Sequence, residues 1–194
     1  RRLRQALPIL SIVGYTNAGK STLLNTLTHS QIPAQDRLFE TLDTTSRRLR
    51  FPHDREIIVT DTVGFIRDLP KDLVGAFRTT LDELRDADML LHVVDASAPN
   101  LDQQITAVDT VLQSLELDTI PRVMVLNKCD QLSAHETNVL CQRYHAIGIS
   151  ALDRETLRPL IAQLETLLPA TPGAPSREED ADQPPQDLVL ASHP

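Results

Sequence analysis

Residues 14 to 27 read GYTNAGKSTLLNTL, and the segment before this stretch and the helix that it enters indicate the fold class. It comes directly after the apolar run 8–13, which suits a buried strand, and it continues into residues 20–28, whose leucines share one face of a helix. Residues 14–21 match the pattern G-x-x-x-x-G-K-S, a glycine-rich loop between strand and helix. Backbone N–H groups of such a loop turn inward and add to the positive end of the helix, so we expect a phosphate group there.

The residues of this loop have separate expected roles. Lys20 reaches the terminal phosphates, and the Ser21 hydroxyl binds Mg²⁺. The residues expected to contact the nucleotide here are Gly14, Tyr15, Thr16, Asn17, Ala18, Gly19, Lys20, Ser21 and Thr22. The alternative interpretation, an ordinary glycine turn, is disfavoured by the strand before the loop and the helix after it.

A second motif, Asn127-Lys128-Cys129-Asp130, follows the apolar run 123–126 and indicates which base is bound. The Asp130 carboxylate can accept hydrogen bonds from the N1–H and the exocyclic amine of guanine, whereas adenine offers an acceptor at the matching ring nitrogen. Leaving such a carboxylate unpaired costs more than losing one contact, so the site discriminates between the bases. We expect Lys128 to lay its stem along the base and Asn127 to join this loop to the phosphate loop. A further turn, with a backbone N–H for the guanine O6, is expected at Ser150, Ala151 and Leu152.

A third motif, Asp61-Thr62-Val63-Gly64, ends the strand predicted at 57–60. Asp61 is expected to hold Mg²⁺ through water, and Gly64 to turn so that its N–H meets the γ-phosphate. An aspartate at a strand end is often only a turn or helix cap. The order and context of the three motifs argue against that alternative.

Strand-like and helix-like stretches alternate between the two ends of the chain. Strands are predicted at 9–13, 49–51, 57–60, 89–94, 123–126 and 146–149, and helices at 20–28, 77–84, 101–117, 134–143 and 156–168. This alternation predicts an α/β fold of the P-loop NTPase type, with a mostly parallel sheet covered by helices on both faces. Ligands of such sheets bind at the carboxyl ends of the strands, where all three motifs fall.

The composition is ordinary for a globular chain and excludes several functional classes. The 194 residues are 41% apolar and 24% charged, and no apolar run approaches the roughly 18 residues of a membrane span. The two cysteines form no disulfide framework, so we expect a reducing, cytoplasmic setting. The net charge of −8 argues against coating of nucleic acid by bulk charge.

The ends of the chain differ from its centre. Six of the 13 prolines lie in 169–194, and residues 170–194 hold half of the net charge. Such a segment buries too little surface to offset its ordering entropy, so we predict a disordered acidic tail over 169–194. The chain does not begin with methionine, and we expect residues 1–7 to end a linker or helix from a missing upstream domain, with 8–168 as the nucleotide-binding domain.

The motifs resemble those of a known family. The order GYTNAGKS, DTVG, NKCD and SAL is that of translation-factor-related GTPases, and the strings GYTNAGKSTL, RLFETLDTTSRR and DTVGFIRDLP resemble the HflX family of ribosome-associated GTPases. The resemblance covers 1–168 and implies GTP hydrolysis, Mg²⁺ as cofactor and association with the large ribosomal subunit, in dissociation or rescue of ribosomes. One departure is Asp43-Thr44-Thr45-Ser46, where the family usually has Asp-Pro-Thr-Thr.

The resemblance also implies roles for the first switch loop. Thr41 would bind Mg²⁺ and sense the γ-phosphate, although the residues themselves leave Thr44 and Thr45 as alternatives. Together with Lys20 and Gly64, Thr41 completes the set expected to act in catalysis. The switch residues expected near the nucleotide are Phe39, Glu40, Thr41, Leu42 and Asp43.

Two features bear on the rate of hydrolysis. Phe65 stands where many GTPases have a water-orienting glutamine, which predicts slow hydrolysis by the isolated domain. Asn17 stands where some GTPases of this broad class use asparagine to bind K⁺, which would stabilise charge between the β- and γ-phosphates. Alternatively, Asn17 only satisfies the turn, because asparagine suits such turns in general.

The sequence leaves the partners more open than the nucleotide. Arg47, Arg48, Arg50 and Arg55 cluster near one strand, either as a solvated edge that discourages aggregation or as a contact for ribosomal RNA phosphates. A monomer is the default. Alternative functions are a GTPase of tRNA modification or ribosome assembly and a GTP-loaded binding module with negligible hydrolysis.

Overall fold

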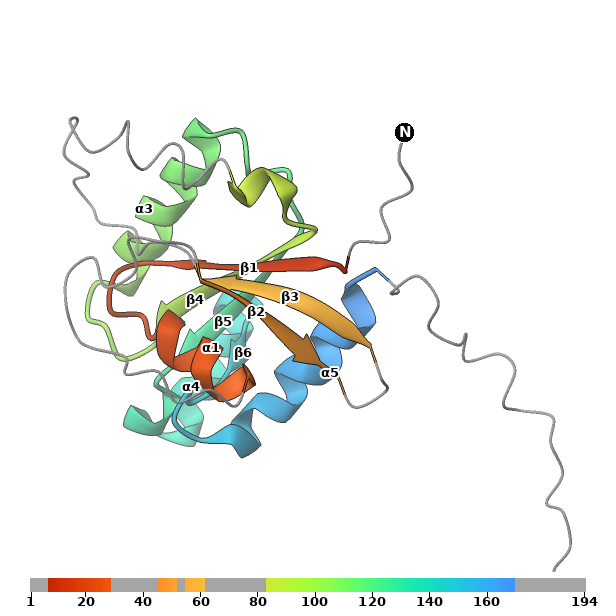
Figure 1. Cartoon of the computed structure of the whole chain (residues 1–194). Helices are drawn as coiled ribbons and strands as arrows, with labels where there is room; N and C mark the ends of the chain where they lie inside the picture. Colours follow the sequence, from red (N-terminus) through yellow and green to blue (C-terminus); the bar gives the residue numbers. More distant parts are fainter. Residues whose placement is uncertain (1–6, 29–44, 52–54, 62–82, 170–194) are drawn as a thin grey trace, which may run out of the picture.

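A computed structural model describes residues 7–28, 45–51, 55–61 and 83–169. Their strands form one six-stranded sheet in the order β2-β3-β1-β4-β5-β6. The strands are β1 (Ile9–Gly14), β2 (Thr45–Arg50), β3 (Glu56–Asp61), β4 (Met89–Asp95), β5 (Arg122–Asn127) and β6 (Ile147–Gly148). Every neighbouring pair is parallel except β2 and β3, which form an antiparallel pair at the edge (Figure 1). The predicted α/β P-loop fold is therefore confirmed.

Helices cover both faces of this sheet. The α-helices are α1 (Lys20–Thr28), α3 (Leu101–Ser114), α4 (Ala134–Tyr144) and α5 (Arg158–Leu167). Short 3-10 turns occupy η1 (Glu83–Asp86), η2 (Cys129–Gln131) and η3 (Arg154–Leu157). The helix predicted at 77–84 lies almost wholly outside the described residues, as does the tail predicted over 169–194.

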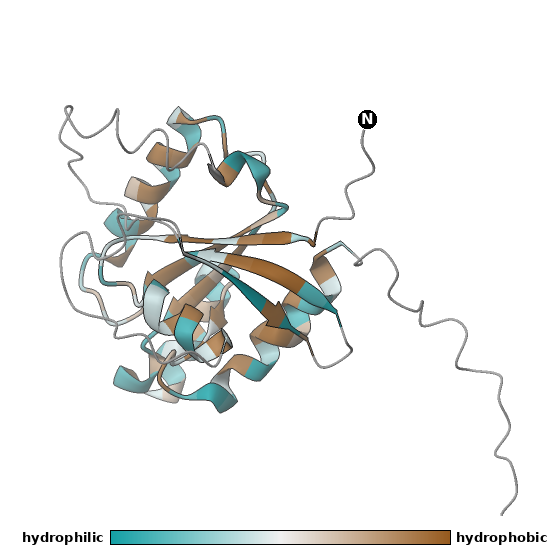
Figure 2. Ribbon diagram, viewed as in Figure 1, coloured by the Kyte–Doolittle hydropathy of each residue, from teal (hydrophilic) through white to brown (hydrophobic). Residues whose placement is uncertain are grey.

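The core has two sides because side chains alternate along each strand. On one side α1 and α5 pack against the sheet in one large apolar cluster that includes Ile12, Leu24, Val93 and Leu160. On the other side two smaller clusters lie beneath α3 and α4. In Figure 2 the central strands are largely brown, the colour of hydrophobic residues, and the helix ribbons alternate between brown and teal segments. β4 is buried along nearly its whole length, as expected for a central parallel strand.

The edge hairpin is longer than predicted. The apolar pattern indicates a strand only at 49–51, whereas β2 begins at Thr45 and carries three arginines. β2 is the outermost strand, so only one of its faces is buried and its pattern is mostly polar. No described helix is long and apolar enough to cross a membrane.

Candidate nucleotide-binding site

The phosphate loop leaves the end of β1 and enters α1, and two glycines allow it to approach its neighbours. A Cβ atom on Gly14 would lie 2.2 Å from the backbone oxygen of Val93 on β4. Gly19 has φ of +90°, and a Cβ atom there would lie 2.3 Å from Nδ2 of Asn127. Only glycine therefore fits at either end of the loop, which explains the two fixed positions of the motif.

The lysine of the loop is the first residue of α1. Lys20 is 7% exposed, and its Nζ donates a hydrogen bond to the Tyr15 carbonyl oxygen at 3.2 Å. The ammonium is thus folded over the loop, on the side where phosphates are expected.

The two predicted Mg²⁺ ligands in the described part of the chain are brought into direct contact. The Ser21 Oγ atom donates a hydrogen bond of 2.7 Å to Oδ2 of Asp61, which ends β3 and is 2% exposed. Oxygen ligands of this kind, one carboxylate and one hydroxyl supplemented by phosphate oxygens, suit Mg²⁺. The residues present therefore fit the ion.

Asn127 joins three loops at the same edge of the sheet. Its Nδ2 donates to the Ala18 carbonyl oxygen at 2.8 Å, and its Oδ1 accepts from the Ala151 N–H at 2.8 Å. Asn127 is 2% exposed, so both bonds are shielded from water. The link between the base loop and the phosphate loop is the one that the sequence analysis expects. The Ala151 N–H, however, is already used by Asn127 in this structure.

The residues predicted to contact the base follow Asn127. Lys128 adopts φ of 65°, in the left-handed region, and its ammonium contacts Asp95 at 2.7 Å. Asp130 lies in the short turn η2 and is exposed. Leu152 is 83% exposed, whereas Ser150, two residues earlier, is buried.

Asp95 contacts the predicted base-reading motif and is absent from the residues that the sequence analysis names. It ends β4 and pairs in register with Asn127, the first residue of the base-reading motif. In the sequence Asp95 stands out only as an aspartate at the end of a buried strand, and an aspartate in that place is more often a turn cap.

Ten of the residues named from the sequence fall outside the described ranges. They are Phe39, Glu40, Thr41, Leu42, Asp43, Thr44, Thr62, Val63, Gly64 and Phe65. Their expected roles stay predictions.

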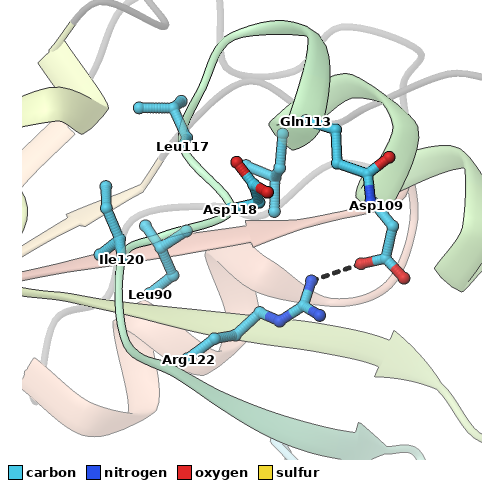
Figure 3. Close-up of a pocket in the computed structure, with 8 residues that line it drawn as sticks. Leu90, Asp109, Gln113, Leu117, Asp118, Ile120 and Arg122 are labelled. Atoms are coloured by element: carbon cyan, nitrogen blue, oxygen red, sulfur yellow. Dashed lines mark hydrogen bonds and ion pairs between the residues drawn. The ribbon is translucent and has the colours of Figure 1, made fainter.

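A small cavity of about 120 Å³ lies near the amino ends of the central strands β4 and β5 (Figure 3). It is lined by Leu90 and Arg122, near the starts of β4 and β5, and by the end of α3, where Arg122 forms an ion pair with Asp109. The three motifs lie instead at the carboxyl ends of the strands. This cavity is therefore separate from the nucleotide site.

The arginines near β2 are largely engaged within the chain. Arg47 donates to Oδ1 of Asn25 at 2.7 Å, and Arg55 donates to backbone carbonyls at the end of α5. Arg48 is 76% exposed, with a long ion pair to Glu56 at 3.9 Å. Arg47 and Arg55 thus have structural roles, which weakens the interpretation of the whole cluster as an RNA contact.

Comparison with known proteins places this site in a family. Residues 9–128 match the family model described as 50S ribosome-binding GTPase. The chain belongs to this family. It is 44% identical over 182 residues to the GTPase HflX of Caldanaerobacter subterraneus subsp. tengcongensis, which covers 92% of this chain and 42% of the relative. It is 48% identical over 138 residues to the GTPase HflX of Escherichia coli, covering 71% of the chain and 32% of the relative. The predicted HflX-type G domain is confirmed, and the chain spans about two fifths of the length of such relatives or less.

Solved structures agree with this assignment. A GTP-binding protein from Sulfolobus solfataricus in complex with GDP is 28% identical, with a TM-score of 0.62 over 81% of this chain and 53% of that one. Era, in complex with MgGDPNP and nucleotides 1506–1542 of 16S ribosomal RNA, is 26% identical, with a TM-score of 0.70 over 92% and 62% of the two chains.

Proposed function

We propose that this chain is the GTP-hydrolysing switch of an HflX-type protein, which converts GTP and water to GDP and phosphate and acts on the large ribosomal subunit. The observation that carries the proposal is the joining of the three motifs at one edge of the sheet. Asn127 binds the phosphate loop, and Ser21 contacts Asp61, although these residues lie far apart in the sequence.

Different residues bind the phosphates, the Mg²⁺ ion and the base. Lys20 and the N–H groups at the start of α1 offset the charge of the phosphates, and Ser21 and Asp61 hold Mg²⁺. When bound, Mg²⁺ neutralises charge that develops between the β- and γ-phosphates. Asp130 accepts hydrogen bonds from guanine, and Lys128 covers the base. We assign sensing of the γ-phosphate to Thr41 and Gly64, and slow intrinsic turnover to Phe65.

The partner and the cation preference are the finer parts of the proposal. The family description supports association with the large ribosomal subunit, and release or rescue of ribosomes is the role we propose for the whole protein. Asn17 is exposed with φ of 60°, a conformation that asparagine tolerates better than most residues. A K⁺ site at Asn17 would raise the hydrolysis rate in KCl above that in NaCl. Equal rates in the two salts would exclude a K⁺ site there.

The test is steady-state GTP hydrolysis by the full-length protein and by this chain, with and without purified large ribosomal subunits. We expect strong stimulation of the full-length protein by the subunits, because a domain without a water-orienting side chain depends on an external activator. Asp130→Asn provides the matched control, since it should lose GTP while leaving the phosphate loop intact. Tight GTP binding with no stimulation would instead indicate another activator or a non-hydrolysing module.

A further inference from the structure

Asp95 holds the lysine of the base-reading motif in place. Its Oδ2 lies 2.7 Å from the Lys128 ammonium, and the two side chains are only 16% and 31% exposed. Its other oxygen, Oδ1, accepts hydrogen bonds from the Ser97 N–H at 2.9 Å and from the Ser97 Oγ at 2.6 Å. The carboxylate is therefore fixed from one side by a turn and binds the ammonium with the other.

The backbone of both residues is also fixed. The Ala96 N–H donates to the Asn127 carbonyl oxygen at 2.8 Å, which extends the pairing of β4 and β5 by one residue. Lys128 then leaves β5 in the left-handed conformation. The two side chains thus start from neighbouring, rigid strand ends, and their contact does not depend on a flexible loop.

The charge state of Asp95 is compatible with a permanent ion pair. Burial raises the pKa of Asp95, but the hydrogen bonds from Lys128 and Ser97 together lower it by more, so the pKa lies below its ordinary value. The carboxylate is ionised at neutral pH. An ion pair that is mostly shielded from solvent is less screened by salt than one at the open surface.

We propose that Asp95 is a positioning residue for the guanine base, which acts by anchoring the Lys128 ammonium so that the methylene stem of Lys128 lies along the bound base. Asp95 itself does not contact the nucleotide. The inference rests on the proposed function, because it assigns the base to the loop that carries Lys128 and Asp130.

The ion pair between Asp95 and Lys128 affects the affinity for the nucleotide through preorganisation. A lysine side chain loses rotamer entropy when it is held in one geometry, and a binding event that must order it loses part of its free energy. Asp95 orders the stem before the nucleotide arrives. Removal of the carboxylate should therefore weaken binding without removing any contact between protein and nucleotide.

A double-mutant cycle on this chain tests the inference, with a fluorescent GDP analogue as the probe. We expect Asp95→Asn and Lys128→Met each to weaken binding about tenfold, the upper end of the cost of ordering one long side chain. The double variant should bind no more weakly than Lys128→Met alone, because Asp95 acts only through Lys128. Additive losses would overturn the inference, and so would an Asp95→Asn variant that binds like the wild type.

Controls separate this inference from a general loss of structure. Asp102→Asn makes the same charge change at an exposed carboxylate on α3, bonded to Arg143 and Tyr144, and should bind GDP normally. Ser97→Ala keeps both charges and removes only the hydrogen bond from Ser97 Oγ to Oδ1, while the bond from the backbone N–H remains. We therefore expect a smaller loss, two- to threefold, that disappears when Lys128 is methionine. It serves as the second variant if Asp95→Asn fails to fold.

A wild-type chain that binds no GDP would refute the proposed function together with this inference, whereas normal wild-type binding with additive losses refutes the inference alone.

Discussion

His92 is a buried imidazole in the central strand β4, and among the described residues neither ring nitrogen has a hydrogen-bond partner. Burial, followed by the positive charge of Arg122, lowers its pKa from 6.5 to about 4; Asp109 opposes this shift, and Lys20 adds to it. The side chain is thus neutral in the folded chain at pH 7. The unfolded chain takes up a proton near pH 6.5, and the folded chain resists it until near pH 4.

This difference predicts a pH dependence of stability. Because the unfolded state binds more protons between pH 6.5 and pH 4, His92 lowers the free energy of unfolding as the pH falls through that window. The expected loss between pH 7 and pH 4.5 is about 2 to 3 kcal/mol. Urea unfolding of the wild type and of His92→Leu at both pH values measures it, since other groups contribute equally to the two proteins. Parallel pH profiles would contradict the assignment.

At the scale of single residues, the sequence predicts the groups that belong to a pattern and misses those defined by a partner. Gly14, Gly19 and Asn127 occupy motif positions, and the structure shows the close approach or the hydrogen bonds that require each of them. Asp95 is recognised only through its contact with Lys128, which depends on the register of β4 against β5. Such a pairing across strands has no local signature in one sequence.

At the scale of elements, the hairpin of β2 and β3 is attached to the last helix through one side chain. Arg55 lies just before β3 and donates to the carbonyl oxygens of Glu165, Leu168 and Pro169, two of them at 2.8 and 2.7 Å. The last carbonyls of a helix have no partner within the helix, so Arg55 supplies the hydrogen-bond donors that the carbonyls at the end of α5 lack. The charge of the guanidinium also suits the negative end of the helix.

Arg55→Ala should therefore lower the free energy of unfolding by about 2 kcal/mol, because partly buried carbonyls lose a charged donor. Arg48→Ala is the matched control: it removes the same charge from the same hairpin, but its side chain is 76% exposed and its ion pair is long. The control should change stability by less than about 0.5 kcal/mol. Chemical denaturation of both variants gives the comparison. Equal losses would show that the charge of the hairpin, and not the cap on α5, matters.

Element boundaries show where the sequence was informative. The bounds of α1 agree with the prediction to the residue, since Gly19 and Lys20 mark its start and three leucines mark its buried face. The last helix was predicted from residue 156, but the chain first makes the 3-10 turn η3, and α5 begins at Arg158 with a proline in its first turn. Proline is compatible with that position and with little else in a helix, which a periodicity argument does not use.

At the scale of the whole molecule, the alternation of strands and helices was enough to predict the fold, because parallel strands require covered faces and right-handed crossovers. The short gap between the strands predicted at 49–51 and 57–60 leaves no room for a crossover, so an antiparallel pair is expected there, as β2 and β3 show. The full strand order was not predictable in the same way, because it depends on which edge of the sheet the hairpin joins.

The nucleotide site draws on loops from residue 14 to residue 152, so binding should stabilise the chain as a whole. A ligand that binds only the folded state adds about 2.7 kcal/mol at a concentration of a hundred times its dissociation constant. For a chain of this size, that corresponds to a rise in melting temperature of about 5 to 10 °C. We expect GDP to produce this shift and ADP to produce none, because the role proposed for the Asp130 carboxylate is to pair with guanine and not with adenine.

Thermal unfolding of the chain with GDP, ADP and xanthosine diphosphate distinguishes base recognition from simple phosphate binding. Asp130→Asn should lose the shift with GDP and gain one with the xanthine nucleotide, since the amide can donate where the carboxylate could only accept. The phosphate loop is unchanged in that variant, which makes it an internal control for the fold. Equal shifts with GDP and ADP would mean that the phosphates alone stabilise the chain. The base-reading role of Asp130 would then be wrong, even though the phosphate loop binds as proposed.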